Sequence, residues 1–310
     1  MFSRQKIKYS ALIFLAILFS GEIILRYCFG FGDAVLMQSD PDFEYIAQPK
    51  QKRLRLRNNV LYNEFGMRNE ALKDSCVKIL GFGDSVINGG TLTNQDDLAT
   101  RKLSESLSES LDTCVQVLNI SAGSWGPDNA AAYLKKYGNF NASLIFLVAN
   151  SHDAHDNMTF DPVVGVYPDF PDRQYAFALH ELLDRYIFPY FFKARYNQNV
   201  SSGINKNGKG FNQGFKMLSE HAKRENIPFI IYLHPEISEL TKGKYNDQGQ
   251  EIIRFAEKNN IRIIKALDYQ LQENEYRDQI HINEAGQEHL SETIEPVILD
   301  LIQNKVTSAN

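Results

Sequence analysis

Short apolar runs rich in β-branched residues recur along the chain from Val77 onward. They predict strands at 77–83, 115–121, 143–149, 228–233 and 261–265. Segments of helical periodicity separate them and predict helices near 95–111, 127–137, 211–225, 246–259 and 284–303. Strands that alternate with helices are typical of a parallel sheet covered on both faces. The pattern therefore predicts an α/β domain over residues 76–304, followed by a short tail at 305–310.

The N-terminus carries a longer apolar stretch, from Tyr9 to Phe29, after the basic residues Arg4, Lys6 and Lys8. At about 1.5 Å per residue it spans roughly 30 Å, the thickness of a bilayer core. A cleaved signal peptide is the alternative, although the residues around Ser20 make a poor cleavage site. We expect an uncleaved anchor over residues 1–30 that enters the inner membrane through residues 9–29. The basic flank places the other end of the helix, and the domain, on the periplasmic side in a bacterium.

Residues 31–75, which follow the anchor, are expected to be a stalk or lead-in. Within them the run from Lys52 to Arg57 alternates Leu and Arg, so a strand there would show leucines on one face and arginines on the other. A solvated edge strand and a surface that binds anionic lipid or glycan are both consistent with this alternation.

The segment 155–210 interrupts the regular alternation of strands and helices. We expect it to form a cap-like insertion near the site, with a helix over much of 174–196 that bends at Pro189. Its aromatic residues pack against the domain or stack on sugar rings and acyl chains; they are Phe160, Tyr167, Phe170, Tyr175, Phe177, Tyr186, Phe188, Tyr190, Phe191, Phe192 and Tyr196.

Composition adds a few limits. The 310 residues, 43% hydrophobic and 23% charged, are enough for one large globular domain with accessory segments. The net charge of −5 argues against nucleic acid as a partner, which would require a basic face.

Two of the three cysteines stand at matched positions. Cys76 directly precedes the strand at 77–83, and Cys114 directly precedes the strand at 115–121. If the two strands pair in parallel, the cysteines lie side by side. They then form either a disulfide, which requires an oxidising compartment, or a pair of buried thiols.

Candidate catalytic residues lie at two distant places in the sequence. Ser85 follows the first strand, where parallel sheets place their ligand crevice. Near the other end, Asp278 precedes His281 by three residues, one turn apart if helical. A serine nucleophile needs a base, and that base needs a group that fixes its tautomer. The three residues together predict a serine esterase or an acyl-transfer enzyme.

Four blocks in order carry a family resemblance. They are Gly83-Asp84-Ser85, the run Asn119 to Ser124, the run Asn150 to Asp153, and Asp278-x-x-His281. The chain resembles the GDSL/SGNH hydrolases over roughly residues 77–300. The resemblance implies a flavodoxin-like three-layer sandwich with a five-stranded parallel sheet and a Ser85–His281–Asp278 triad. It also implies an oxyanion hole built from three donors: the backbone N–H of Ser85, a backbone N–H of the second block and an Asn side chain of the third.

The chain departs from the family pattern at two of these donors. In the second block the expected Gly is replaced by Ser124, with Gly123 as an alternative, and a backbone donor tolerates either. In the third block His152 stands where the family has Asn, with Asn150 as the alternative. An imidazole can donate one N–H, or two when protonated, so we interpret His152 as a modified oxyanion donor.

The resulting hypothesis is a serine-dependent esterase or O-acyltransferase that needs no cofactor. Its expected substrate is an acylated carbohydrate or other ester, above all an acetyl ester of a cell-envelope glycan. Two alternatives stay open. One is a non-catalytic glycan-binding or scaffold protein on the same fold. The other is a metal-assisted hydrolase that uses the His152 cluster, in which His155, Asp153 and Asp156 lie close by in sequence.

Overall fold

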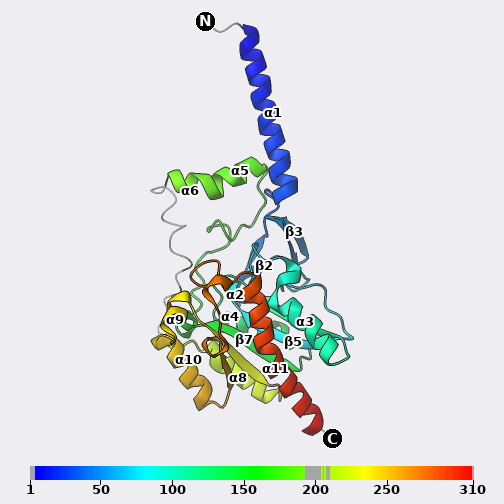
Figure 1. The fold of residues 1–310 in the computed structure, drawn as a ribbon, viewed down its shortest axis with the longest axis vertical. Helices are drawn as coiled ribbons and strands as arrows, with labels where there is room; N and C mark the ends of the chain where they lie inside the picture. Colours follow the sequence, from blue (N-terminus) through cyan, green and yellow to red (C-terminus); the bar gives the residue numbers. More distant parts are fainter. Residues whose placement is uncertain (1–3, 193–203, 205, 207–209, 309–310) are drawn as a thin grey trace.

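The computed structural model describes residues 4–192, 204, 206 and 210–308. A long helix, α1 (Arg4–Phe29), projects from one end of an α/β body, and the C-terminus lies at the opposite end (Figure 1). Within the described part of the chain, α1 is the one helix whose length and apolar composition suit a membrane span, and none of that span is buried in the protein. Length and composition would equally suit a signal sequence.

The body is built on a five-stranded parallel sheet. Its strands are β5 (Val77–Gly83), β6 (Val115–Ser121), β7 (Leu144–Asn150), β8 (Phe229–His234) and β9 (Arg262–Lys265), in the spatial order β6-β5-β7-β8-β9. Numbered along the domain, this order is 2-1-3-4-5, that of flavodoxin-like folds. The predicted fold class is confirmed, and each predicted strand lies within one residue of the observed one.

Helices cover the sheet on both sides because side chains alternate along each strand. One face packs on α3 (Ala99–Ser110) and α11 (Glu284–Ser308). The other packs on α4 (Pro127–Tyr137), α8 (Gly214–Arg224) and α10 (Asp247–Lys258). Short helices complete the body: α2 (Ser85–Asn88), α9 (Ile237–Lys242), and the single turns η1 (Gln95–Asp97), η2 (Ser151–Ala154), η4 (Ala266–Tyr269) and η5 (Glu273–Glu275).

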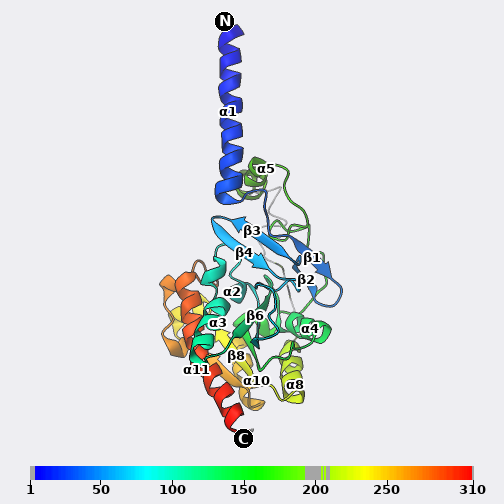
Figure 2. The same cartoon turned by 90° about the vertical axis from the view of Figure 1, so that its right-hand side faces the viewer.

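The lead-in segment forms two antiparallel hairpins between α1 and the sheet (Figure 2). They are β1 (Met37–Asp40) with β2 (Glu44–Ala47), and β3 (Gln51–Arg55) with β4 (Asn58–Tyr62). Phe43 and Tyr45 are fully buried and join the same hydrophobic core as one face of the sheet. The indole N–H of Trp125 donates to the Tyr45 carbonyl at 2.9 Å. This segment is therefore part of the packed body.

The basic run in β3 is not a solvated edge strand. Arg55 is buried, with 3% of its side chain exposed, and pairs with the fully buried Glu181 at 2.6 Å. Arg53 pairs with Asp33 at 2.8 Å, whereas Lys52 and Arg57 are exposed. An unpaired buried charge is very costly, so the distant Glu181 accounts for the burial of Arg55.

The two matched cysteines are joined. Cys76 and Cys114 form a disulfide with their Cα atoms 4.6 Å apart, next to the paired residues Val77 and Val115. This confirms the disulfide and excludes the buried-thiol alternative. Cys28, in α1, is free and exposed.

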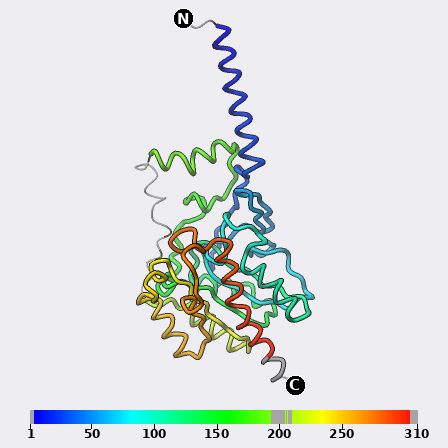
Figure 3. The backbone as a smooth tube through the Cα atoms, in the orientation of Figure 1, coloured from blue at the N-terminus to red at the C-terminus, as the bar shows by residue number. Residues whose placement is uncertain are grey.

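The aromatic insertion contains α5 (Ala178–Leu182), a π-helical turn η3 (Leu183–Ile187) and α6 (Phe188–Phe191). Figure 3 traces them as one continuous rod beside the lower end of α1. The π turn directly precedes Pro189, where the sequence predicts a bend. Tyr196 lies outside the described residues.

Candidate active site

Strand β5 and helix α2 position the candidate nucleophile. The strand ends at Gly83, where a Cβ would lie 2.8 Å from both Ile87 Cγ2 and the Val148 carbonyl oxygen. Asp84 caps α2, accepting from the Val86 N–H at 2.9 Å. Ser85 is therefore the first residue of a short helix, held at the carboxyl end of a central strand.

The candidate base and its partner lie in a tight turn between η5 and α11. Asp278 Oδ1 accepts from the backbone N–H groups of Ile280 and His281 at 3.0 and 2.9 Å. An Asx-type turn therefore brings Asp278 and His281 together. The sequence predicted a helical turn here, and that prediction is wrong. Burial opposes ionisation of Asp278, but these N–H groups and His281 outweigh it and lower its pKa.

These elements bring the three predicted residues into hydrogen-bond contact. His281 Nδ1 lies 2.7 Å from Asp278 Oδ2, and His281 Nε2 lies 2.9 Å from Ser85 Oγ. Ionised Asp278 accepts the Nδ1 proton, which leaves Nε2 free to accept from the Ser85 hydroxyl. This geometry suits proton removal from a nucleophilic serine.

His234 and Tyr276 attach this turn to β8, and the sequence did not predict this role for either residue. His234 ends β8, is fully buried, and its Nε2–H donates to the Ile280 carbonyl at 3.0 Å. Burial lowers the pKa of His234 to about 4, so the ring is neutral at physiological pH. Tyr276 stacks on His234 and donates its hydroxyl hydrogen to the Pro235 carbonyl at 2.6 Å. His234 therefore supports the turn that carries His281.

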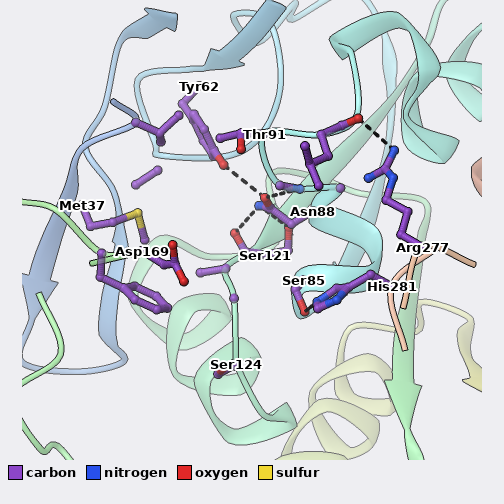
Figure 4. A pocket seen from close by; sticks show the side chains of 18 of the residues that line it. Met37, Tyr62, Ser85, Asn88, Thr91, Ser121, Ser124, Asp169, Arg277 and His281 are labelled. Carbon is purple, nitrogen blue, oxygen red and sulfur yellow. Dashed lines mark hydrogen bonds between the residues drawn. The ribbon is translucent and has the colours of Figure 1, made fainter. Parts of the chain in front are cut away.

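Ser85 and His281 open into a cavity of about 440 Å³. Figure 4 shows Tyr62 and Met37 on one side of it, opposite Ser85 and His281. The wall combines apolar groups with polar ones, such as Asn88 and Arg277. Cavities of this size and mixed lining are typical of small-molecule sites.

A buried polar network holds α2 against β6. Asn88 Nδ2 donates to Ser121 Oγ at 3.0 Å, and the Tyr62 hydroxyl lies 3.2 Å from Asn88 Oδ1. Asn119 Nδ2 donates to the Ile87 carbonyl at 2.7 Å. Sequence reasoning placed Asn119 in a motif block but did not identify Asn88 or Tyr62. The signal for Asn88 was its place three residues after Ser85, one turn along the same helix.

The predicted second donor belongs to the loop that follows β6, in the wall of the cavity. Both Ser124 and its alternative Gly123 line the cavity with Ser85. Ser124 has a φ of 57°, in the left-handed region that favours Gly, the residue type that the family carries at this position. The Tyr45 hydroxyl donates to the Gly123 carbonyl at 2.9 Å and helps to fix this loop.

The predicted third donor lies in a cluster of carboxylates. His152 Nδ1 is 3.3 Å from Glu236 Oε1, while its Nε2 is 4.0 Å from Asp153 Oδ1 and 3.9 Å from Asp156 Oδ2. The last two distances exceed a hydrogen bond. Burial alone would lower the pKa of His152, but these carboxylates and Asp84 raise it to about 10. His152 is therefore protonated at neutral pH.

The alternative donor, Asn150, is already engaged. Its side-chain N–H donates to Asp84 Oδ2 at 3.0 Å, and its backbone N–H donates to Asp153 Oδ2 at 2.7 Å. Burial raises the pKa values of Asp84 and Asp153, which His152 opposes. Asn150 thus ties the third block to the residue that precedes the nucleophile.

The suggested metal ligands converge only in part. His152, Asp153 and Asp156 could each direct one ligand atom to a common point. His155 is turned away, with its Nε2 2.8 Å from Glu251 on α10. The His-x-x-His pair seen in the sequence therefore does not converge.

The insertion contributes to the wall of the cavity. Phe170 and Arg185 line it, and Arg185 is held by Glu181 at 3.2 Å and Asp169 at 2.8 Å. Phe170 packs edge-on against Tyr45, with ring centroids 5.0 Å apart. Helix α6 forms the end of the rod that lies farther from α1 (Figure 1).

No family model and no curated protein matches the chain. Among solved structures it is similar to a member of the lipolytic G-D-S-L family from Veillonella parvula. That match has 14% identity and a TM-score of 0.41, and covers 72% of this chain and 98% of the other. A psychrotrophic esterase from Pseudoalteromonas matches at 12% identity, with coverages of 74% and 98% and a TM-score of 0.40. An acetyl-xylooligosaccharide esterase from Geobacillus, solved as a variant, matches at 14%, with coverages of 74% and 94% and a TM-score of 0.40. These likenesses concern the fold.

Proposed function

We propose that this protein is a serine-dependent ester hydrolase or O-acyltransferase of the GDSL/SGNH type. The observation that carries the proposal is the unbroken chain of hydrogen bonds from Ser85 Oγ through His281 to Asp278, at 2.9 and 2.7 Å. Residues nearly 200 positions apart in sequence meet in the order that nucleophilic catalysis requires.

In the proposed reaction Ser85 Oγ attacks the ester carbonyl while His281 Nε2 takes its proton. The tetrahedral oxyanion is stabilised by the backbone N–H groups of Ser85 and Ser124 and by the imidazolium of His152. His281 then protonates the departing alcohol, and an acyl-enzyme remains. Water completes a hydrolysis, whereas a hydroxyl of an acceptor completes a transfer.

As substrate we propose an acetyl ester of a cell-envelope glycan. A cavity of about 440 Å³ accommodates a sugar-sized group next to Ser85. Arg277 and Thr91 offer hydrogen bonds to hydroxyl groups, and Met37 and Phe170 offer apolar contact to the face of a ring.

We further propose that α1 remains attached as an anchor and that the body lies on the periplasmic side. The disulfide Cys76–Cys114 favours an oxidising compartment. Glu22 of α1 accepts from the backbone N–H groups of Ala178 and Leu179 at 2.8 and 2.9 Å. Removal of α1 would leave the start of α5 uncapped. Sequencing the N-terminus of the mature protein tests this, because a start after residue 20 would contradict it.

Release of acetate from an aryl acetate tests the activity directly. The full-length protein in detergent should turn the ester over, and Ser85→Ala should not. Ser39→Ala, which removes an exposed hydroxyl on β1, is the matched control and should behave as wild type. Ester turnover that survives in Ser85→Ala would reject the proposal.

A further inference from the structure

The rod formed by α5, η3 and α6 lies across the lower end of α1 (Figure 1). It is attached there by polar contacts. The Glu22 carboxylate caps its first turn, and Arg26 Nη2 donates to the Ala176 carbonyl at 2.9 Å. Gly21 lies next to Leu179, so the rod meets α1 at the level of its last three turns. These contacts explain why Glu22 and Arg26 occur in the apolar stretch from Tyr9 to Phe29.

The three charged side chains of this rod, Glu181, Asp184 and Arg185, face the protein. Glu181 is fully buried and binds Arg55. Asp184 accepts from the Tyr175 hydroxyl at 2.7 Å, and only 12% of the Arg185 side chain is exposed. A helix at a water-exposed surface has the opposite arrangement, with its polar side chains outward.

Several aromatic side chains of the rod are exposed, most of them at the end farther from α1. Tyr190 is 72% exposed, Phe191 70% and Phe192 57%, and Phe177 at the start of the rod is 63% exposed. Contiguous exposed aromatic surface is rare on a soluble monomer and marks a site of contact with an apolar phase or partner. A helix that buries its charged side chains and exposes aromatic ones is stable where its exposed face contacts an apolar phase or partner.

Two observations favour lipid as that phase. The rod lies level with the lower end of α1 (Figure 1), whose exposed apolar surface suits a bilayer core. The exposed guanidinium of Arg57 lies over the ring of Phe29, the last residue of α1, at 5.0 Å from its centroid. Aromatic rings and basic side chains are enriched where a membrane meets water, and basic side chains attract anionic headgroups.

We propose that the rod Ala178–Phe191, extended by Phe192, lies in the membrane–water interface and holds the catalytic body at a fixed orientation to the bilayer. This inference rests on the anchor included in the proposed function. Arg185, on the inner side of the rod, also lines the cavity, so the rod and the cavity share a wall. The body then presents Ser85 to esters at the membrane surface, and an acylated glycan carried on a lipid is the substrate class that this geometry suits.

The test uses full-length Phe191→Trp in vesicles of phosphatidylethanolamine and phosphatidylglycerol with brominated acyl chains. Because bromine quenches indole at contact distance, the new Trp fluorescence should be strongly quenched after subtraction of the wild-type signal from buried Trp125. Tyr190→Trp serves as a second reporter. Met217→Trp is the matched control: Met217 is also an exposed apolar residue, at 44%, but lies on α8 at the far end of the body (Figure 1).

A blue-shifted emission at position 191 without quenching would mean that a protein covers the rod, and would overturn the proposal. Equal quenching at 191 and 217 would also overturn it, because the body would then lie on the membrane without a defined face. The readout does not depend on catalysis and can be repeated in Ser85→Ala.

An activity measurement extends the test to the substrate class. In the triple variant Tyr190→Ser/Phe191→Ser/Phe192→Ser, turnover of a water-soluble aryl acetate should stay as in wild type. Turnover of an acetylated glycolipid in vesicles should fall several-fold. An equal rate on the glycolipid would contradict membrane presentation. Failure of the wild type on both esters would instead reject the proposed function and leave the quenching result standing.

Discussion

The helices of the α/β body and the rod at the foot of α1 bury opposite faces. In the body, α3 turns Leu103 and Leu107 toward the sheet and its charged residues outward. In the rod, Glu181 is buried and Tyr190 and Phe191 are exposed. The same rule, that each face meets a medium of its own polarity, accounts for both. The difference shows that the exposed aromatic surface of the rod suits an apolar medium, and that the candidate site lies in the body with Arg185 of the rod in its wall.

The largest effect expected concerns the body. Ser85→Ala or His281→Ala should each lower kcat for an aryl ester by about four to six orders of magnitude, whereas Asp278→Asn should leave a small activity. Because the three residues act as a unit, the Ser85→Ala/His281→Ala double variant should be scarcely slower than either single one. Steady-state kinetics measure this. If the losses in log kcat of the two single variants add up in the double variant, the residues act independently and the triad is contradicted.

A second prediction tests the polar side of the rod. Arg55→Met leaves the Glu181 carboxylate buried without its main partner and should lower the free energy of unfolding by about 3–5 kcal/mol. Thermal unfolding in detergent measures the loss. Arg55→Met/Glu181→Leu removes both charges and should recover most of it. If the double variant is as unstable as the single one, the ion pair is not what fixes the rod.

The contrast also separates what sequence reasoning could and could not predict. Strands such as Val77–Gly83 and Val115–Ser121 were predicted at their true bounds because apolar residues, many of them β-branched, make up most of each short run. Ser85, Asp278 and His281 could be named because each occurs in a short local motif. The rod was predicted as a bent helix, but its inverted faces depend on the contact between Arg55 and Glu181, which are 126 positions apart. No local pattern encodes such a contact.

The same limit applies within the site. His152 was singled out because it replaces an expected Asn. Its positive charge could not be predicted, because it depends on Glu236, which comes from the end of a different strand. His234 supports the turn that carries His281 through a contact with Ile280, 46 positions away in sequence.

A third prediction concerns His152 as an oxyanion donor. His152→Ala should lower kcat by roughly a hundred- to a thousandfold with little change in KM, because the bond to the oxyanion strengthens in the transition state. His152→Asn should recover part of that loss. Kinetics with and without a chelator measure both. A change in KM alone would indicate that His152 binds substrate and does not stabilise the oxyanion. A loss of activity with a chelator equal to that of His152→Ala would favour the metal alternative.

The smallest effect expected is on stability. The pKa of His152 is raised from its ordinary value to about 10, so its stabilising contribution is full below about pH 6.5 and is lost as pH rises through 10. A third of the side chain is exposed, so solvent screening limits the contribution to about 1 kcal/mol. Unfolding of wild type and His152→Asn between neutral and alkaline pH measures it. Parallel curves would show that His152 is not charged in the folded protein.

The central claim is that Ser85 is a nucleophile activated by His281, and covalent labelling tests it most directly. A fluorophosphonate reacts only with an activated serine, whose Oγ displaces fluoride from phosphorus. Peptide mass spectrometry of the labelled full-length protein should find one phosphonyl group, on the peptide that contains Ser85, and none after the same treatment of His281→Ala. A label on another serine, or an unmodified Ser85 in folded wild-type protein, would contradict the account.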